Sequence, residues 1–155
     1  MSIVHLTCGK ICSGKSYLAA HLAKKENALI LSVDELMLTL HAQCLGDKHK
    51  EAETGCLEYL LQKAAEASAL GVNVIIDYGF FLRNERAHAR QFFQNQKITV
   101  KWHYLQADNA TRKQRLLERN KKLTLSPKRE HIITPEMMER FDSGFEELLP
   151  FEVPR

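Results

Sequence analysis

An eight-residue segment near the N-terminus carries the clearest chemical signal in the sequence. Residues 9–16 fit the pattern G-x4-G-K-[ST], in which glycines let backbone N–H groups turn inward around a phosphate. The lysine of this pattern reaches the β and γ phosphates of a nucleotide, and the hydroxyl after it binds magnesium. The segment therefore predicts an ATP and Mg²⁺ site made by Gly9, Lys10, Ile11, Cys12, Ser13, Gly14, Lys15 and Ser16.

A second oxygen ligand for the metal is expected from Asp77, which ends the apolar run Val72–Ile76. In proteins with this phosphate-binding loop, an acid in such a place supports the magnesium ion or orients water. The alternative interpretation is an Asx-turn before Gly79. We expect Ser16 and Asp77 to hold the metal together.

Short apolar strands alternating with helical patterns must position these residues. The apolar runs predict four strands, and the repeats of apolar residues at helical spacing predict the helices that follow them. Asp34, Asp108 and Thr134 are the expected N-caps, and Gly71 is an expected C-terminal cap. The predicted strands are 3–8, 28–32, 72–77 and 98–105, and the predicted helices are 14–25, 35–38, 57–70, 83–94, 109–120 and one from 134.

This alternation predicts an α/β fold of three layers, with a mainly parallel sheet of four to five strands and helices on both faces. The length of 155 residues suits a single domain over residues 1–155. Residues 123–133 are mostly polar and basic and include Pro127, so a loop is expected there. The segment 149–155 is expected to be irregular.

Composition excludes several classes of protein. No apolar stretch approaches the length of a membrane span, and the first residues lack the pattern of a secretion signal, so we expect a cytoplasmic protein. The four cysteines are therefore expected to be thiols, and their spacing does not suit a zinc site. The net charge of +3 is small, but residues 112–130 hold eight Lys or Arg against two Glu.

The other motifs narrow the kind of nucleotide-binding protein. A GTPase needs D-x-x-G and N-K-x-D, and residues 77–80 and 120–123 each fail at the last position. The larger ATPases need further signature regions and usually a longer chain. Small kinases are the class that remains.

Over nearly its whole length the sequence resembles P-loop kinases of the zeta-toxin, chloramphenicol phosphotransferase and polynucleotide 5′-kinase group. Residues 9–16 are the specific match, and Ser32-Val33-Asp34 resembles the element in which an acid activates the acceptor hydroxyl. The resemblance implies the P-loop NTPase fold and makes Asp34 the candidate base and acceptor ligand. Asp34 could also simply cap the next helix.

The same resemblance implies three functional arginines. Arg86 matches an arginine on the acceptor side, with a solvated helix face as the alternative. Arg115 and Arg119 match two arginines of the family's lid helix, and the resemblance implies a small helical lid over residues 109–133. In the family, these lid arginines neutralise the transferring phosphoryl group. They lie four residues apart and hence on one helical face.

These features together lead to an ATP- and Mg²⁺-dependent phosphotransferase with Lys15, Asp34, Arg115 and Arg119 as catalytic residues. The charges around the expected acceptor pocket are mixed rather than basic, which favours a small hydroxyl compound over a nucleic-acid end. No membrane partner is expected. The alternative is an ATP-binding regulatory domain that has no phosphoryl acceptor.

Overall fold

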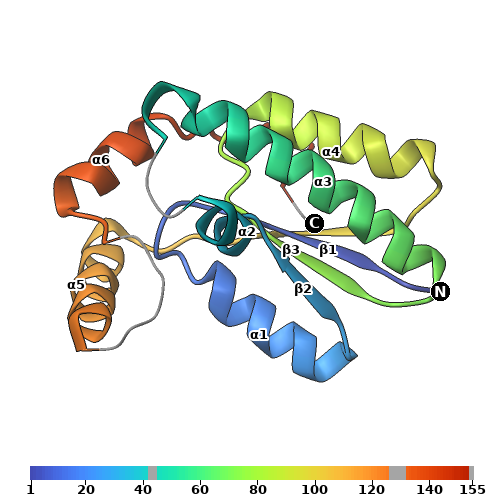
Figure 1. Ribbon diagram of the computed structural model, residues 1–155, viewed down its shortest axis with the longest axis horizontal. Coiled ribbons are helices and arrows are strands. Elements are labelled where there is room, and N and C mark those ends of the chain that lie inside the picture. The colour runs from blue at the N-terminus through green and yellow to red at the C-terminus, as the bar shows by residue number, and fades with distance from the viewer. Residues whose placement is uncertain (42–44, 126–131, 154–155) are drawn as a thin grey trace.

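Four parallel strands form one sheet in the order β2-β3-β1-β4 within the part of the chain that the structure describes (Figure 1). The structure is a computed structural model and describes residues 1–41, 45–125 and 132–153. The expected parallel sheet is confirmed. Its elements are β1 (Val4–Cys8), α1 (Lys15–Glu26), β2 (Leu29–Ser32), α2 (Val33–Leu40), the short 3-10 turn η1 (Gly46–Lys48), α3 (His49–Ala69), β3 (Val74–Asp77), α4 (Arg83–Asn95), β4 (Val100–Tyr104), α5 (Asn109–Leu125) and α6 (Pro135–Ser143).

Helices cover both faces of the sheet, because successive residues of β3 are apolar and point to opposite faces. Val74 and Ile76 of β3 belong to the larger core, which includes residues of α3 and α4, whereas Ile75 packs with Ala19 and Leu22 of α1. Figure 1 shows α3 and α4 on one side of the sheet and α1 on the other. Because side chains of a strand point alternately to its two faces, apolar residues at successive positions require cover on both faces. The predicted three-layer arrangement is confirmed.

Helix starts agree with the predicted caps at two of three positions. The Asp108 Oδ1 accepts a hydrogen bond of 2.8 Å from the Thr111 N–H, and the Thr134 Oγ1 accepts one of 3.1 Å from Met137 N–H. The prediction that Asp34 is an N-cap is wrong. Ser32 caps α2, with its Oγ 3.2 Å from the Glu35 nitrogen, so Asp34 lies within the first turn of the helix.

Three helices are longer than the sequence pattern predicts, and α2 spans Val33–Leu40 rather than 35–38. Helix α3 begins at His49 rather than near Leu57, and α5 continues to Leu125, so the first residues of the predicted loop 123–133 are helical. Residues 126–131 of that loop lie outside the described residues. Gly71 follows α3 with a positive φ of 81° and closes it as expected.

Helices α5 and α6 lie together at one end of the molecule, beyond the carboxyl ends of the strands (Figure 1). Arg112 of α5 donates to both carboxylate oxygens of Asp142 in α6, at 3.0 and 2.6 Å. Arg112 is almost fully buried, so this pair fixes α5 against α6. None of the helices in the described ranges has the length and apolar character that crossing a membrane requires.

The segment after α6 is irregular as expected through residue 153, yet it is held firmly. Glu152 is buried and accepts hydrogen bonds from Arg86 of α4, with Nε–Oε1 at 3.0 Å and Nη2–Oε2 at 3.2 Å. Arg90 adds a third contact to Glu152 at 3.3 Å. This segment therefore docks on α4 through buried charges.

Candidate active site

The phosphate-binding loop connects the end of β1 to the first turn of α1, as the sequence predicts. A Cβ on Gly9 would lie 2.5 Å from the Leu105 carbonyl oxygen, so only glycine fits where the loop passes the end of β4. Gly14 has a φ of 106° and precedes α1 in the left-handed region. The first N–H groups of α1 therefore face the loop, and they suit an anion.

Lys15 closes this loop in the structure. Its Nζ donates to the carbonyl oxygens of Gly9 at 2.9 Å and Lys10 at 2.8 Å. Burial lowers the pKa of Lys15, while the charges of Asp77 and Asp34 act in the opposite direction. An anionic phosphate placed in the loop would replace these carbonyls as the partner of the ammonium group.

Ser16 and Asp77 are brought together from α1 and β3. The Ser16 Oγ donates to the Asp77 Oδ2 at 2.8 Å, although 61 residues separate them. A hydroxyl and a carboxylate beside a phosphate loop are the oxygen ligands that Mg²⁺ prefers, and the ion usually keeps several waters as well. The two residues thus fit the metal that the sequence leads us to expect.

Asp34 lies at the same edge of the sheet, two residues after the end of β2. In the parallel register Ser32 of β2 pairs with Asp77 of β3, so both acids follow neighbouring strand ends. Asp34 has an exposed surface, but many protein atoms surround its carboxyl group. The resulting desolvation raises the pKa of Asp34, and the negative charges of Glu53 and Asp77 raise it further. Lys15 and Arg119 oppose that shift, so charges of both signs act on Asp34.

The two predicted arginines of α5 act on the phosphate loop and on Asp34. Arg115 donates from Nη1 to the Cys12 carbonyl oxygen at 3.1 Å, and it passes close to Gly14. Arg119 lies one turn further along α5 and acts electrostatically on Asp34. The structure therefore brings both arginines, from one helical face, to the loop and the acid.

Arg86 does not lie with Arg115, Arg119 and Asp34. Its guanidinium is 1% exposed, pairs with Glu152, and donates to the Phe80 carbonyl oxygen at 2.9 Å. A buried guanidinium with these partners is not available to an acceptor. Its observed role is to hold the segment after α6, so the expectation of an acceptor ligand is replaced by a structural role.

Arg112, which connects α5 to the phosphate loop and to α6, is a residue that the sequence pattern does not reveal. Besides Asp142, Arg112 donates to the Ile11 carbonyl oxygen at 3.2 Å and to the Asn109 Oδ1 at 2.7 Å. It lies three residues before Arg115 in a helix rich in basic residues. Nothing local to the sequence distinguishes it from its exposed neighbours, because its partner is 30 residues away.

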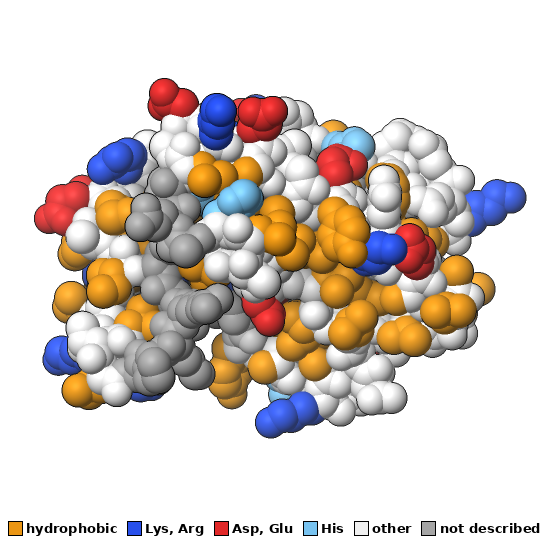
Figure 2. Space-filling model, in the orientation of Figure 1, with side chains coloured by type: hydrophobic (Ala, Val, Ile, Leu, Met, Phe, Trp, Pro, Cys, Tyr) orange, Lys and Arg blue, Asp and Glu red, His pale blue; other side chains and the backbone are white. Residues whose placement is uncertain are grey.

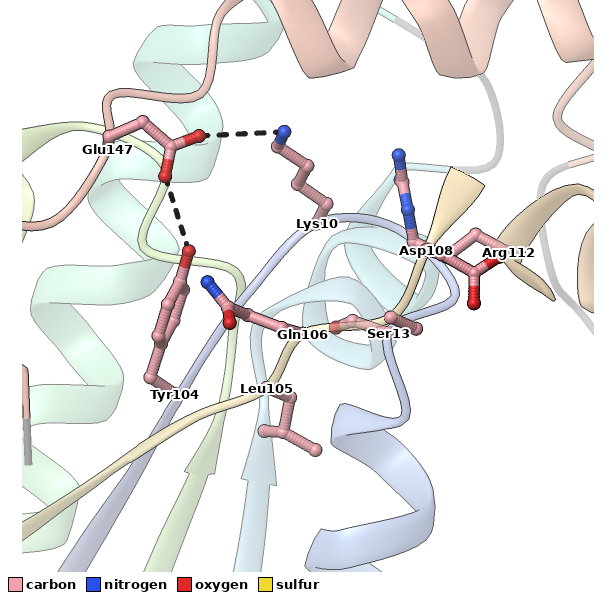
Figure 3. A pocket seen from close by; sticks show the side chains of 9 residues that line it. Lys10, Ser13, Tyr104, Leu105, Gln106, Asp108, Arg112 and Glu147 are labelled. Atoms are coloured by element: carbon pink, nitrogen blue, oxygen red, sulfur yellow. Dashed lines mark hydrogen bonds and ion pairs between the residues drawn. The ribbon is translucent and has the colours of Figure 1, made fainter. Parts of the chain in front are cut away.

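A pocket of about 310 Å³ lies between this loop, the end of β4 and the segment after α6. Figure 3 shows the side chains of Lys10, Tyr104 and Glu147 pointing toward one another there. Glu147 is 3.6 Å from the Lys10 Nζ and accepts a hydrogen bond of 3.4 Å from the Tyr104 hydroxyl. The conformation of the phosphate loop is thereby connected to the C-terminal segment. The lining residues are Lys10, Ser13, Tyr104, Leu105, Gln106, Ala107, Asp108, Arg112 and Glu147.

The fold matches solved kinase structures. A provisionally assigned kinase from Chloroflexus aurantiacus superimposes with a TM-score of 0.71 at 17% identity, covering 89% of this chain and 73% of that one. The APS kinase of Mycobacterium tuberculosis, in complex with AMPPNP and APS, gives 0.64 at 20% identity, with 81% and 76% covered. A gluconokinase from Sinorhizobium meliloti gives 0.62 at 14% identity, with 94% and 75% covered. These likenesses establish the P-loop NTPase fold.

Sequence comparison supplies the family. No curated protein matches the chain. A family model described as an AAA domain matches residues 4–143, which span every helix and strand from β1 to α6. The matched region contains the phosphate loop, Asp34, Asp77 and the arginines of α5. This chain therefore belongs to the AAA domain family AAA_33.

Proposed function

We propose that this protein is an ATP- and Mg²⁺-dependent kinase that moves the γ phosphate of ATP to an acceptor hydroxyl. The observation that carries the proposal is the position of Asp34, a carboxylate that follows the end of β2 beside the end of β3, where Asp77 contacts Ser16 of the phosphate loop. A domain that only binds ATP needs the phosphate loop but has no use for a carboxylate opposite it. The kinases among the structural neighbours support the same class by analogy of fold.

ATP binds at the phosphate loop. Residues 9–16 surround its phosphates with backbone N–H groups, Lys15 contacts the β and γ phosphates, and Arg115 reaches them from α5. Ser16 and Asp77 hold Mg²⁺, which neutralises charge on the phosphates when it is bound. Lys15 leaves the carbonyls of Gly9 and Lys10 as the nucleotide enters.

Transfer follows from the placement of Asp34. The acceptor oxygen attacks the γ phosphorus, the bond between that phosphorus and the β–γ bridging oxygen breaks, and its electron pair leaves with ADP. The Asp34 carboxylate takes the proton of the acceptor hydroxyl. Arg115 and Arg119 offset the negative charge that spreads over the phosphoryl oxygens, so catalysis rests mainly on positioning and electrostatics.

The proposal also covers the kinase group, the domain and its lid, the cellular location and the class of acceptor. We place the protein with the zeta-toxin, chloramphenicol phosphotransferase and polynucleotide 5′-kinase group, on the matches of residues 9–16, Asp34, Arg115 and Arg119. Residues 1–155 act as one cytoplasmic domain, and residues 109–133 serve as its lid. The acceptor is a small molecule rather than a nucleic-acid end.

The experiment that tests the proposal follows the label of γ-phosphate-labelled ATP with Mg²⁺ present. One set of reactions offers hydroxyl-bearing small molecules, and another offers an oligonucleotide with a 5′-hydroxyl. Label on a small molecule supports the kinase. Label that appears only as free phosphate, at a rate no acceptor changes, would instead support the ATP-binding regulatory domain.

A further inference from the structure

The phosphate loop contains a residue with a strained backbone. Cys12 has a φ of 58°, in the left-handed region that residues other than glycine seldom adopt. A residue in this region costs free energy and keeps its conformation only where surrounding contacts hold it. The contacts on either side of Cys12 therefore decide whether the loop keeps the shape that surrounds a phosphate.

Two arginines of α5 hold the peptide groups on either side of Cys12. Arg112 donates from Nη1 to the Ile11 carbonyl oxygen at 3.2 Å, and Arg115 donates from Nη1 to the Cys12 carbonyl oxygen at 3.1 Å. The angles φ and ψ describe the rotation of these two peptide groups about the Cα of Cys12, so the two arginines fix both angles. Because a peptide group is planar and trans, the direction of the Ile11 carbonyl also sets that of the Cys12 N–H.

Arg112 is the more firmly placed of the two arginines. Its side chain is 2% exposed, and both carboxylate oxygens of Asp142 accept hydrogen bonds from it, at 3.0 and 2.6 Å. The Asn109 Oδ1 accepts a further hydrogen bond from it at 2.7 Å. Arg115 is exposed and contacts the loop from the surface of α5. The guanidinium of Arg112 is therefore already ordered, so its contact with the loop requires little further loss of side-chain freedom.

We propose that Arg112 is a positioning residue for the donor nucleotide: it holds the Ile11 carbonyl and so preorganises residues 9–16 for the phosphates of ATP. This inference rests on the part of the proposed function that places ATP at the phosphate loop. A loop without this contact must be ordered by the nucleotide as it binds, and part of the binding free energy is then used for that ordering. Loss of one hydrogen bond from a charged donor should weaken ATP binding by about tenfold.

The test replaces Arg112 with lysine. Arg112→Lys keeps a positive charge for Asp142, but its ammonium nitrogen lies one bond closer to the backbone than the Nη1 atom that reaches Ile11. The Kd of the ATP analogue AMPPNP with Mg²⁺, measured by isothermal titration calorimetry, should rise by about tenfold. The KM for ATP in phosphoryl transfer should rise by a similar factor, while kcat at saturating ATP changes by less than about threefold, because bound ATP itself orders the loop.

A double-mutant cycle separates the contact with Ile11 from an indirect effect on Arg115. Arg115→Ala removes the contact with the Cys12 carbonyl and the proposed contact with the phosphates. If Arg112 acts through Ile11, Arg112→Lys should raise the Kd severalfold in the Arg115→Ala protein as well. No rise in that protein would overturn the inference, because Arg112 would then act only by placing Arg115.

Two control variants separate positioning from general loss of stability. Phe93→Leu removes buried volume near the end of α4 and should lower the Tm, and Lys113→Gln changes an exposed neighbour of Arg112; both should leave the Kd unchanged. An unchanged Kd in Arg112→Lys, or an equal rise in Phe93→Leu, would overturn the inference and leave the kinase standing. Binding of AMPPNP with no labelled acceptor would remove the kinase function but not the inference. Wild-type protein that does not bind AMPPNP would overturn both.

Discussion

In the mechanism that we propose, Asp34 activates the acceptor hydroxyl, and the charges around it change its pKa. Its carboxyl is desolvated and lies near the charges of Glu53 and Asp77, which together raise its pKa. A general base works only in its ionised form, and its efficiency improves as its pKa approaches the working pH. The neighbouring acids therefore make Asp34 a stronger base than a solvated aspartate, while the charges of Lys15 and Arg119 oppose the rise in its pKa.

The first prediction concerns the acid limb of the pH profile. Asp34 must lose its proton to act, so kcat/KM should fall on the acid side with a midpoint above 3.8, the usual pKa of aspartate. Glu53→Gln removes one negative charge and should move that midpoint to lower pH. The measurement is kcat/KM from about pH 4 to 8, with Glu51→Gln as control. A midpoint that does not move in Glu53→Gln would contradict this account of the charges.

The second prediction concerns Lys15. Lys15→Ala removes the ammonium group from the phosphate loop, and turnover should fall by roughly a hundredfold or more. Lys24→Ala, an exposed lysine near the end of α1, should retain full turnover. Steady-state kinetics with ATP and Mg²⁺ measure both variants. Near-normal turnover in Lys15→Ala would exclude this loop as the donor site.

The residue types of the phosphate loop could be predicted because their spacing is local in the sequence. Arg86 could not be assigned in this way. Its observed partner Glu152 lies 66 residues further on, and the interaction depends on how the C-terminal segment docks. The Ser16–Asp77 contact is also distant in sequence, but an acid at the end of an apolar strand was enough to anticipate it.

At the scale of elements, α5 carries two sets of arginines with different purposes. Arg115 contacts the phosphate loop and Arg119 acts electrostatically on Asp34, whereas Arg112 is buried against Asp142 and Ile11. The buried pair fixes the angle at which α5 leaves β4, and that angle brings the other two arginines to the loop. The buried structural arginine and the two arginines that we propose as catalytic are thus separated along one helix.

The third prediction tests that separation. Asp142→Asn leaves the buried Arg112 guanidinium without its counter-charge, and the free energy of unfolding should fall by about 1–3 kcal/mol. Glu139→Gln removes an exposed pair with Lys113 in the same helix and should cost only about 0–0.5 kcal/mol. Urea unfolding of the two variants gives the comparison. Equal losses in both would show that the Arg112–Asp142 pair has no special role.

Sequence periodicity located the elements well where a polar cap precedes an apolar repeat, as at Asp108 and Thr134. It misplaced the cap of α2, because Ser32 and Asp34 are both good N-cap residues and the helix begins with the first of them. The starts of α3 and the end of α5 also differ from prediction. Their additional turns are polar or lack the repeat that marks a buried helix face.

Across the whole molecule, the segment after α6 connects the sheet, α4 and the phosphate loop. Glu152 pairs with Arg86, and Glu147 contacts Lys10 and Tyr104 (Figure 3). Burial opposes ionisation of Glu152, but hydrogen bonds from Arg86 and the Leu149 N–H with the charge of Arg86 outweigh it and lower its pKa. On the face drawn in Figure 2, charged side chains lie mostly around the rim and hydrophobic side chains occupy much of the middle and right, in contrast to this buried pair.

The fourth prediction follows from that pair. Glu152→Gln leaves a buried guanidinium without its partner charge, and the free energy of unfolding at neutral pH should fall by about 3 kcal/mol. Because the folded pKa of Glu152 is lowered, its contribution is present above about pH 4.5, the usual value, and is lost as the pH falls through the folded pKa. The difference between wild type and Glu152→Gln should therefore shrink in acid. Urea unfolding of both proteins at neutral pH and at a pH well below 4.5 measures this difference. A difference of the same size in acid would contradict the stabilising role of the ionised Glu152.

The layered architecture of the molecule could be predicted because apolar strands alternate with helices along the chain. The strand order β2-β3-β1-β4 could not, because parallel strands pair across long connections that the sequence pattern does not specify. The position of residues 145–153 against α4 could not be predicted from the sequence either. A short irregular segment has no periodicity, and its position is set by buried partners in α4.

The most direct measurement compares phosphoryl transfer and ATP affinity in wild type, Asp34→Asn and Glu35→Gln. Glu35 is the exposed neighbour of Asp34 in the first turn of α2, so Glu35→Gln is the matched control. Our account predicts that Asp34→Asn binds ATP with unchanged affinity but loses transfer to the acceptor by roughly a hundredfold or more, while Glu35→Gln retains both. Near-normal transfer in Asp34→Asn would contradict the central claim that Asp34 activates the acceptor hydroxyl.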